Sequence, residues 1–151
     1  TLDYPTEDEE RDILRRDRAQ HQGATIEAAA PVLDVATVLA ARQEVNQVHV
    51  SDLVEAYIVA LVRASREPGR WRAEWAQAIE VGASPRASIA LAHAAAAHAY
   101  LNGRDYVSPD DVVEIAPDVL RHRLALSLDA RVRQISRNDF VAGLLEAVPA
   151  P

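Results

Sequence analysis

A long alanine-rich stretch with well-marked ends constrains the fold of this chain more than any other part of its sequence. Ser84-Pro85 precede the stretch and Gly103 follows it. Serine is favoured as the cap of a helix N-terminus and proline at the first helical position. Glycine commonly adopts the left-handed conformation that ends a helix. Because alanine is the strongest helix former, we expect a helix from Pro85 to about Asn102 that its neighbours can approach closely.

The composition favours an all-α fold. Hydrophobic residues make up 49% of the 151 residues, but much of this share is alanine and only 5% of the chain is aromatic. Such a composition suits close-packed helices better than a β-sandwich. A chain of this length is sufficient for one domain that buries about two-thirds of its unfolded surface.

Five further helices are expected from capping residues and from the helical spacing of apolar side chains. They lie at about 6–20, 35–46, 52–67, 109–123 and 136–148, and residues 48–50 should form a short extended bridge. Pro117 should interrupt the helix that begins at Pro109, because a proline disfavours helical conformation in the residue before it. Residues 124–135 fit a strand in part and a helix in part. The predicted fold is an all-α bundle of about six helices, with one small two-stranded patch as an option.

We expect one domain over residues 1–151, with a lead-in helix and linker at 1–33 and the bundle at 34–151. Residues 21–33 contain Gly23 and Pro31 and show little periodicity, so we expect a loop there. Methionine is absent from the whole sequence. We therefore expect a processed protein or a piece of a longer one.

Arg86 occupies a position where a cation is unfavourable. It falls at about the second residue of the alanine-rich helix, near the positive end of the helix dipole, where a cation costs about 0.3–1 kcal/mol. The other Ser-Pro helix start, at Ser108-Pro109, instead continues with Asp110 and Asp111. A helix N-terminus binds anions through its free N–H groups, so Arg86 there points to phosphate binding. The alternative is a solvated surface arginine whose long stem carries its charge away from the dipole.

Arg121-His122-Arg123 is a compact cationic cluster near a predicted helix end. Cations are favourable at the C-terminus of a helix dipole, which is one explanation of the cluster. The other is that these three residues form a secondary site beside the Ser84-Pro85-Arg86 site. The sequence leaves both explanations open.

The two tryptophans, Trp71 and Trp75, are four residues apart. This spacing can place both rings on one face of a short helix, where they would pack together. We favour a local hydrophobic cluster under a loop. A role in stacking on a ligand is the alternative.

Several kinds of chemistry are excluded or disfavoured. The chain has no cysteine, which rules out disulfides and thiolate chemistry and permits a reducing cytoplasm. It has no lysine, so it cannot contain the Gly-Lys-Ser/Thr core of a P-loop. His93 and His98 are five apart, about 140° around a helix, so they cannot bind one metal ion together, and we expect no metal site.

The charge and the apolar pattern also bear on possible partners. Asp and Glu number 23 against 16 arginines, a net charge of -7, and a nucleic-acid-binding protein usually carries a basic surface. We therefore expect no nucleic-acid partner. The longest apolar run, 87–101, is mostly alanine and too short to span a membrane, so no membrane span is expected.

The sequence resembles the MoxR-type AAA+ ATPases in several motifs that occur in the right order. The central motifs are Gly82-Ala83-Ser84-Pro85-Arg86-Ala87 and Gly103-Arg104-Asp105-Tyr106-Val107-Ser108-Pro109-Asp110-Asp111-Val112. They are followed by Ala116-Pro117 and Val119-Leu120-Arg121-His122-Arg123. Similar segments upstream are Tyr4-Pro5, Glu9-Glu10, Ile13-Leu14, Val54, Tyr57-Ile58-Val59 and Leu61-Val62. The resemblance covers nearly the whole chain. Magnesium-chelatase-type lids are also similar, especially at the His-Arg motif.

The resemblance implies that this chain is the C-terminal helical lid of such an ATPase. By that analogy Arg86, with Ser84 and Pro85, would contact the phosphates of ATP as the sensor-2 arginine. ATP and Mg²⁺ would be bound mainly by an ATPase core that this sequence lacks, so the segment alone would not hydrolyse ATP. The segment between Arg66 and Gly82 is longer than is usual in the family and holds both tryptophans.

The resemblance also implies partners. They would be the ATPase core of the same chain, neighbouring subunits of a homo-hexameric ring in the cytoplasm, and a client protein that the sequence does not name. The role of the parent would be remodelling, maturation or metal insertion of that client. A stand-alone helical interaction module without nucleotide chemistry remains the alternative, and a DNA-binding helical domain is disfavoured by the charge.

Overall fold

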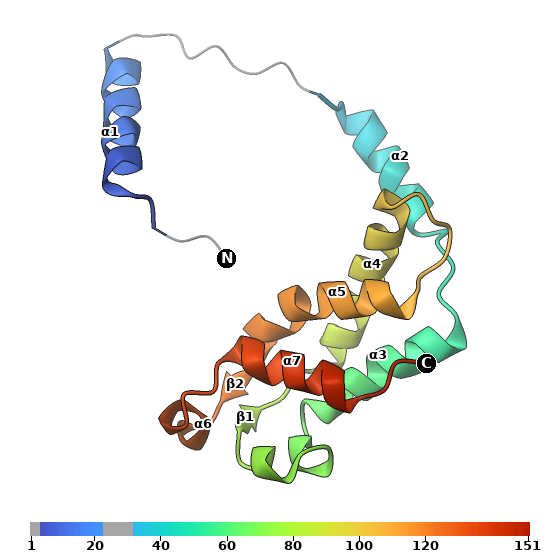
Figure 1. Ribbon diagram of the computed structural model, residues 1–151. Helices are drawn as coiled ribbons and strands as arrows, with labels where there is room; N and C mark the ends of the chain where they lie inside the picture. The colour runs from blue at the N-terminus through green and yellow to red at the C-terminus, as the bar shows by residue number, and fades with distance from the viewer. Residues whose placement is uncertain (1–3, 23–31) are drawn as a thin grey trace. The chain divides into compact units, whose positions relative to one another are not determined.

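The computed structural model describes residues 4–22 and 32–151. The chain divides into two compact units, Thr1–Asp34 and Val35–Pro151, which we describe separately. Helix α1 (Glu7–His21) belongs to the first unit (Figure 1). The remaining helices and strands named below belong to the second.

Helix α1 forms where its capping box predicts it. Thr6 accepts a hydrogen bond from the backbone of Glu9, and the Glu9 side chain accepts one from the Thr6 N–H in return. No side chain of α1 is buried, and Ile13 and Leu14 remain 55% and 61% exposed. The loop predicted at 21–33 lies largely outside the described residues.

The second unit is a helical bundle with one small sheet, which confirms the predicted fold class. Its elements are α2 (Val35–Val45), α3 (Asp52–Ala64), α4 (Pro85–Leu101), α5 (Pro109–Leu120), α6 (Leu128–Val132) and α7 (Arg137–Ala147), the 3₁₀ turns η1 (Pro68–Arg70), η2 (Ala73–Trp75) and η3 (Arg121–Arg123), and the strands β1 (Ile79–Val81) and β2 (Ala125–Leu126). The short helix α6, capped by Ser127, is the one that the predicted set of six omits.

Serine side chains define most of the helix starts. Ser51 caps α3, and Ser108 and Ser136 form capping boxes with Asp111 and Asp139 at the starts of α5 and α7. Each hydroxyl accepts a hydrogen bond from a backbone N–H that would otherwise lack a helical partner. These local signals are the reason why the helix boundaries agree well with the sequence pattern.

The core lies between α3, α4, α5 and α7. Phe140, Leu61, Leu91, Leu120 and Leu144 are fully buried there. Helix α4 contributes mainly alanines to this core, and α4 and α5 form the most extensive helix pair of the unit (Figure 1). Small side chains on α4 therefore serve close packing, as the alanine-rich composition predicts.

The prediction that Pro117 interrupts its helix is wrong. Helix α5 continues through Pro117 to Leu120, and only then tightens into the turn η3. An interior proline costs about 3 kcal/mol or more, because it removes a backbone hydrogen bond and crowds the preceding turn. Ala116 and Leu120, both fully buried, anchor this part of α5 in the core and offset that cost.

Two short pairings of extended backbone join distant parts of the unit. Strands β1 and β2 are antiparallel, with Ile79 opposite Leu126 and Val81 opposite Ala125. The predicted extended segment at 48–50 is confirmed, because His49 pairs with Tyr106 in an isolated bridge. Residues 124–135, which fitted both a strand and a helix, contain one of each.

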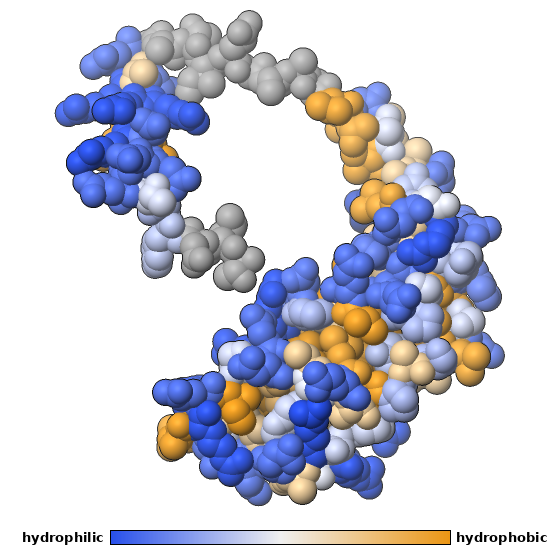
Figure 2. Space-filling model, viewed as in Figure 1, coloured by the Kyte–Doolittle hydropathy of each residue, from blue (hydrophilic) through white to orange (hydrophobic). Residues whose placement is uncertain are grey.

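Helix α2 exposes the apolar side that the sequence places on it. Val35, Val38 and Leu39 are 76%, 45% and 51% exposed, and Figure 2 shows apolar side chains gathered along this helix. Its C-terminal end is attached to α4, since the Tyr100 hydroxyl donates a hydrogen bond of 2.6 Å to Glu44. The rest of α2 has an apolar surface that this unit does not cover.

Candidate functional site

Arg86 is exposed at the first turn of α4. Within the described ranges 4–22 and 32–151, no carboxylate or hydrogen-bond acceptor pairs with its guanidinium. Ser84 has the extended backbone of an N-cap residue and Pro85 is the first helical residue, as predicted. The Ser84 side chain makes no capping hydrogen bond in the described structure, unlike the caps of α1, α3, α5, α6 and α7. In the described structure the start of α4 therefore presents an unpaired cation beside an N-cap serine whose side chain makes no capping bond.

The two residues before this helix start are fixed to the end of α3. The hydroxyl of Ser65, which is fully buried, accepts a hydrogen bond of 3.0 Å from the Ala83 N–H and donates one of 2.7 Å to the Val62 carbonyl. The Nε of Arg66 donates a hydrogen bond of 2.7 Å to the Ala83 carbonyl. Both backbone groups of Ala83 are thus held by consecutive residues of another segment.

Gly82 is required for this attachment. A Cβ at Gly82 would lie 2.7 Å from the Ser65 carbonyl oxygen and 2.8 Å from the Arg66 Cα. These are backbone atoms, so a side chain there would force the two segments apart. Gly82, Ser65 and Arg66 together fix where α4 begins, and they fix the origin of the Arg86 side chain with it.

The cationic cluster Arg121-His122-Arg123 and the start of α4 are both connected to the small sheet. Helices α4 and α5 pack against each other and are connected by residues 102–108 (Figure 1). Strands β1 and β2 are antiparallel with Val81 opposite Ala125, so the chain leaves β1 toward α4 at the same end of this pair at which it enters β2 from η3. The small sheet therefore links the two sets of residues that the sequence singled out separately.

A second cluster, which the sequence pattern did not indicate, lies at the connection between α4 and α5. Asp111 is only 1% exposed and accepts hydrogen bonds from the two terminal nitrogens of Arg104 at 2.6 and 2.5 Å. The Ser108 N–H and hydroxyl donate to it, both at 2.8 Å, and the His98 Nδ1 lies 2.7 Å away. The Arg104 guanidinium, the Ser108 groups and the His98 ring hold the pKa of Asp111 far below its usual range, against the effect of burial.

The two tryptophans have different environments. Trp75 is 8% exposed and packs on Phe140 with ring centroids 5.0 Å apart, while the Arg72 guanidinium lies 4.7 Å from the centre of the Trp75 ring. Trp75 is therefore part of the main core. Trp71 is 41% exposed and borders a groove instead.

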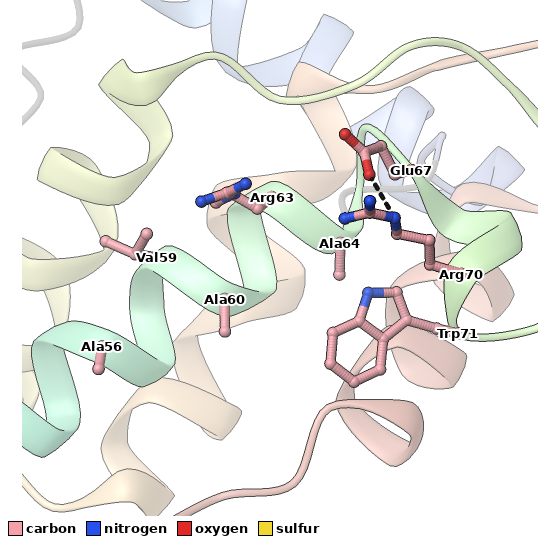
Figure 3. A pocket seen from close by; sticks show the side chains of 8 residues that line it. All are labelled: Ala56, Val59, Ala60, Arg63, Ala64, Glu67, Arg70 and Trp71. Carbon is pink, nitrogen blue, oxygen red and sulfur yellow. Dashed lines mark ion pairs between the residues drawn. The ribbon is translucent and has the colours of Figure 1, made fainter.

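That groove lies along the outer side of α3 and encloses about 490 Å³. Figure 3 shows alanines of α3 on one side and the Trp71 ring facing them. Glu67 and Arg70 form an ion pair of 2.9 Å near its edge. The lining residues are Ala56, Val59, Ala60, Arg63, Ala64, Glu67, Arg70 and Trp71. Stacking of a ligand on Trp71 remains a prediction.

Metal binding and membrane spanning are two other functions on which the described part of the chain bears. No group of three or more histidine and acidic side chains is arranged to hold a metal ion there. Also within the described ranges, no helix is both long and apolar enough to cross a membrane.

A family model described as the AAA lid domain matches residues 72–142, which include the α4 start and the whole of α5. The chain is also 36% identical over 149 residues to the chaperone MoxR1 of Mycobacterium tuberculosis. The chain belongs to the AAA lid domains, of the MoxR type. The resemblance noted in the sequence is thereby confirmed.

Other relatives agree with this assignment. YeaC of Bacillus subtilis, an uncharacterised protein, is 35% identical over 99% of this chain, and MoxR of Methylorubrum extorquens is 34% identical over 84% of it. A crystal structure of a predicted ATPase from Cytophaga hutchinsonii superposes with a TM-score of 0.81 at 34% identity, over 99% of this chain and 45% of that one. The MoxR-type lid covers only 38% of MoxR1 and 43% of YeaC, so it corresponds to less than half of each relative.

Proposed function

We propose that this MoxR-type lid closes over ATP bound by an ATPase core and that Arg86 contacts the phosphates. The observation that carries the proposal is Arg86, exposed and without a partner among the described residues, at a helix start whose preceding backbone is held by Ser65 and Arg66. Residues 1–33 would connect that core to the lid at 34–151. The family membership supports a core outside this chain, because the relatives are more than twice as long.

The chemistry of Arg86 suits this role. A guanidinium can donate two parallel hydrogen bonds to phosphate oxygens, and in phosphoryl transfer it stabilises the charge that develops on the transferred group. The positive end of the α4 dipole favours the same anion. ATP and Mg²⁺ would be held mainly by the core, so Arg86 would report on the terminal phosphate and link nucleotide state to lid position.

The activity of the parent protein is part of the same proposal. We infer that it hydrolyses ATP as a homo-hexameric ring in the cytoplasm and uses the energy to remodel or mature a client protein, or to insert a metal into it. The name of MoxR1 as a chaperone supports the client role. The absence of cysteine is compatible with a reducing compartment.

The decisive experiment is Arg86→Ala in the full-length gene product. We expect turnover to fall by about tenfold or more, since a charge-assisted contact to the transferred phosphate is lost, while nucleotide binding survives largely intact. Arg63→Ala, which removes an exposed arginine of α3, is the matched control and should leave turnover unchanged. Normal turnover in Arg86→Ala would contradict the proposed contact.

A second candidate is a helical interaction module without nucleotide chemistry. The exposed apolar side of α2 favours it, because large uncovered apolar surfaces commonly mark interaction sites. The lid proposal expects residues 1–151 alone to show no ATPase activity and little affinity for ATP. Tight ATP binding by this chain would contradict the accessory role, and a gene without an upstream P-loop would favour the interaction module.

A further inference from the structure

The three residues of the cluster Arg121-His122-Arg123 differ in whether their side chains have partners. Arg121 forms an ion pair with Asp118, and the His122 Nδ1 lies 3.0 Å from the Asp118 carbonyl oxygen at the end of α5. Arg123 has no ion pair within the described residues. Its Nε is moreover buried and without any hydrogen-bond partner in that part of the chain. The dipole explanation therefore suits Arg121 and His122 but leaves Arg123 unexplained.

A buried donor without a partner is unusual and calls for a ligand. Leaving a buried polar group unsatisfied costs about 1–3 kcal/mol, and more for a charged one. The position of Arg123 indicates what the ligand is. Strands β1 and β2 are antiparallel with Val81 opposite Ala125, so the chain arrives from Arg123 at the same end of this pair at which it leaves toward Ala83 and the start of α4. Arg86 follows Ala83 by three residues.

We propose that Arg123 is a second phosphate-binding cation at the Arg86 site. The inference rests on the proposed function and adds a residue to it. Within the described residues neither Arg86 nor Arg123 has a carboxylate partner, and both are reached from the same end of the β1–β2 pair, so an anion held by both would offset their mutual repulsion. A polyphosphate has several acceptor oxygens, so it can bind two guanidiniums at once. Each guanidinium can donate two parallel hydrogen bonds to it. The ligand class is therefore the phosphate chain of a nucleoside triphosphate.

A carboxylate of the ATPase core is the competing partner for Arg123. Both ligands are anionic, but only the phosphate leaves when ATP is replaced by ADP. Arginine-selective labelling with phenylglyoxal, mapped by mass spectrometry on the full-length protein, separates the two. We expect a non-hydrolysable ATP analogue with Mg²⁺ to protect Arg86 and Arg123 from labelling, ADP to protect them less, and Arg121 to be labelled equally in both states. Equal labelling of Arg123 with the analogue and with ADP would overturn the proposal.

Kinetics supply the second test. Arg123→Gln should lower turnover by about tenfold or more, and Arg121→Gln, its matched control, should leave turnover within about twofold of wild type. Arg123→Lys keeps the positive charge but lacks the planar guanidinium, so its turnover should lie between that of Arg123→Gln and that of wild type. The double variant Arg86→Gln/Arg123→Gln should lose less than the product of the two single losses, because both residues act on the same group.

Folding is controlled by thermal melting of each variant. If Arg123→Gln has a normal melting temperature and normal turnover while Arg86→Gln is impaired, phosphate binding by Arg123 is contradicted and the proposed function stands. If Arg86→Gln itself turns over normally, the proposed function fails first. If Arg123→Gln does not fold, the labelling of the wild-type protein still decides the question.

Discussion

Arg104 and Asp111 form a buried bidentate ion pair that closes the connection between α4 and α5. The two contacts measure 2.6 and 2.5 Å, and Asp111 is 1% exposed. Arg104 follows the turn at Gly103, which adopts a positive φ of 71°, and Asp111 is the third residue of α5. The Asp111 carboxylate therefore completes the capping box of α5 with Ser108 and also holds the preceding turn. Both interactions help to set how α5 packs on α4.

The Asp111→Asn variant should be strongly destabilised. It leaves the partly buried Arg104 guanidinium without its counter-charge, and breaking a buried pair by removing one partner costs about 3–5 kcal/mol. Urea denaturation of the chain measures the change. Asp110→Asn alters the exposed neighbouring carboxylate of the same helical turn and should cost less than about 1 kcal/mol. Equal stabilities of the two variants would contradict the central role of Asp111.

Acid should unfold the wild-type chain through the same residue. The pKa of Asp111 is lowered in the folded state, first by the Arg104 hydrogen bonds, whereas the unfolded chain titrates near the usual 3.8. A lowered pKa contributes stability that is complete above the unfolded value and is lost as pH falls through it toward the folded one. We expect the melting temperature to decline from about pH 5 to pH 3 and to decline less in Asp111→Asn. An identical pH profile in both proteins would rule out this contribution.

A methyl group at Gly82 should displace the start of α4. In Gly82→Ala the new Cβ meets backbone atoms of Ser65 and Arg66 at 2.7 and 2.8 Å, so the contact cannot be relieved by a rotamer change. We expect a loss of about 1–3 kcal/mol in stability and a fall in turnover of the full-length protein. Gly103→Ala is a useful comparison, because its Cβ meets nothing within 4 Å and only the positive φ opposes it. A comparable loss of turnover in both variants would argue against a specific effect on Arg86.

Gly143 should be as intolerant of substitution as Gly82, and tryptophan fluorescence can report the effect. A Cβ at Gly143 would lie 1.7 Å from the Trp75 Cη2, inside the buried indole. Gly143→Ala should therefore push Trp75 off Phe140, shift its fluorescence to longer wavelength and destabilise the chain by about 1–3 kcal/mol. Trp71→Phe in both backgrounds isolates the Trp75 signal. An unchanged spectrum would show that the ring packs elsewhere in solution.

Sequence patterns were sufficient where the determining interaction is local. The caps at Ser51, Ser108 and Ser136 bond to backbone three residues later, so a short stretch of sequence predicts them. The continuation of α5 through Pro117 was not predictable in this way. It depends on burial of Ala116 and Leu120 against other elements, which no local rule contains.

The same contrast holds for the candidate site. The helix start around Arg86 follows from Ser84 and Pro85, but the clamp on Ala83 joins residues 17 and 18 positions apart. Asp111 is predictable as part of a capping box, whereas its bond to Arg104 depends on the shape of the intervening turn. The connection of both Arg123 and the start of α4 to one end of the small sheet depends on a strand register of only two residue pairs. Each of these contacts is set by tertiary structure.

The hydrogen bonds of Ser65 and Arg66 to Ala83 have a consequence for how this lid can diversify. They tie the two ends of the Trp71-bearing segment to each other, so the segment leaves and re-enters the bundle at one fixed point. The entropic cost of closing a loop grows only slowly with loop length, so residues inserted around η1 should lower the stability of the fold only slightly. New recognition sequences can therefore be inserted there, in evolution or by protein engineering, while the backbone that carries Arg86 keeps its position.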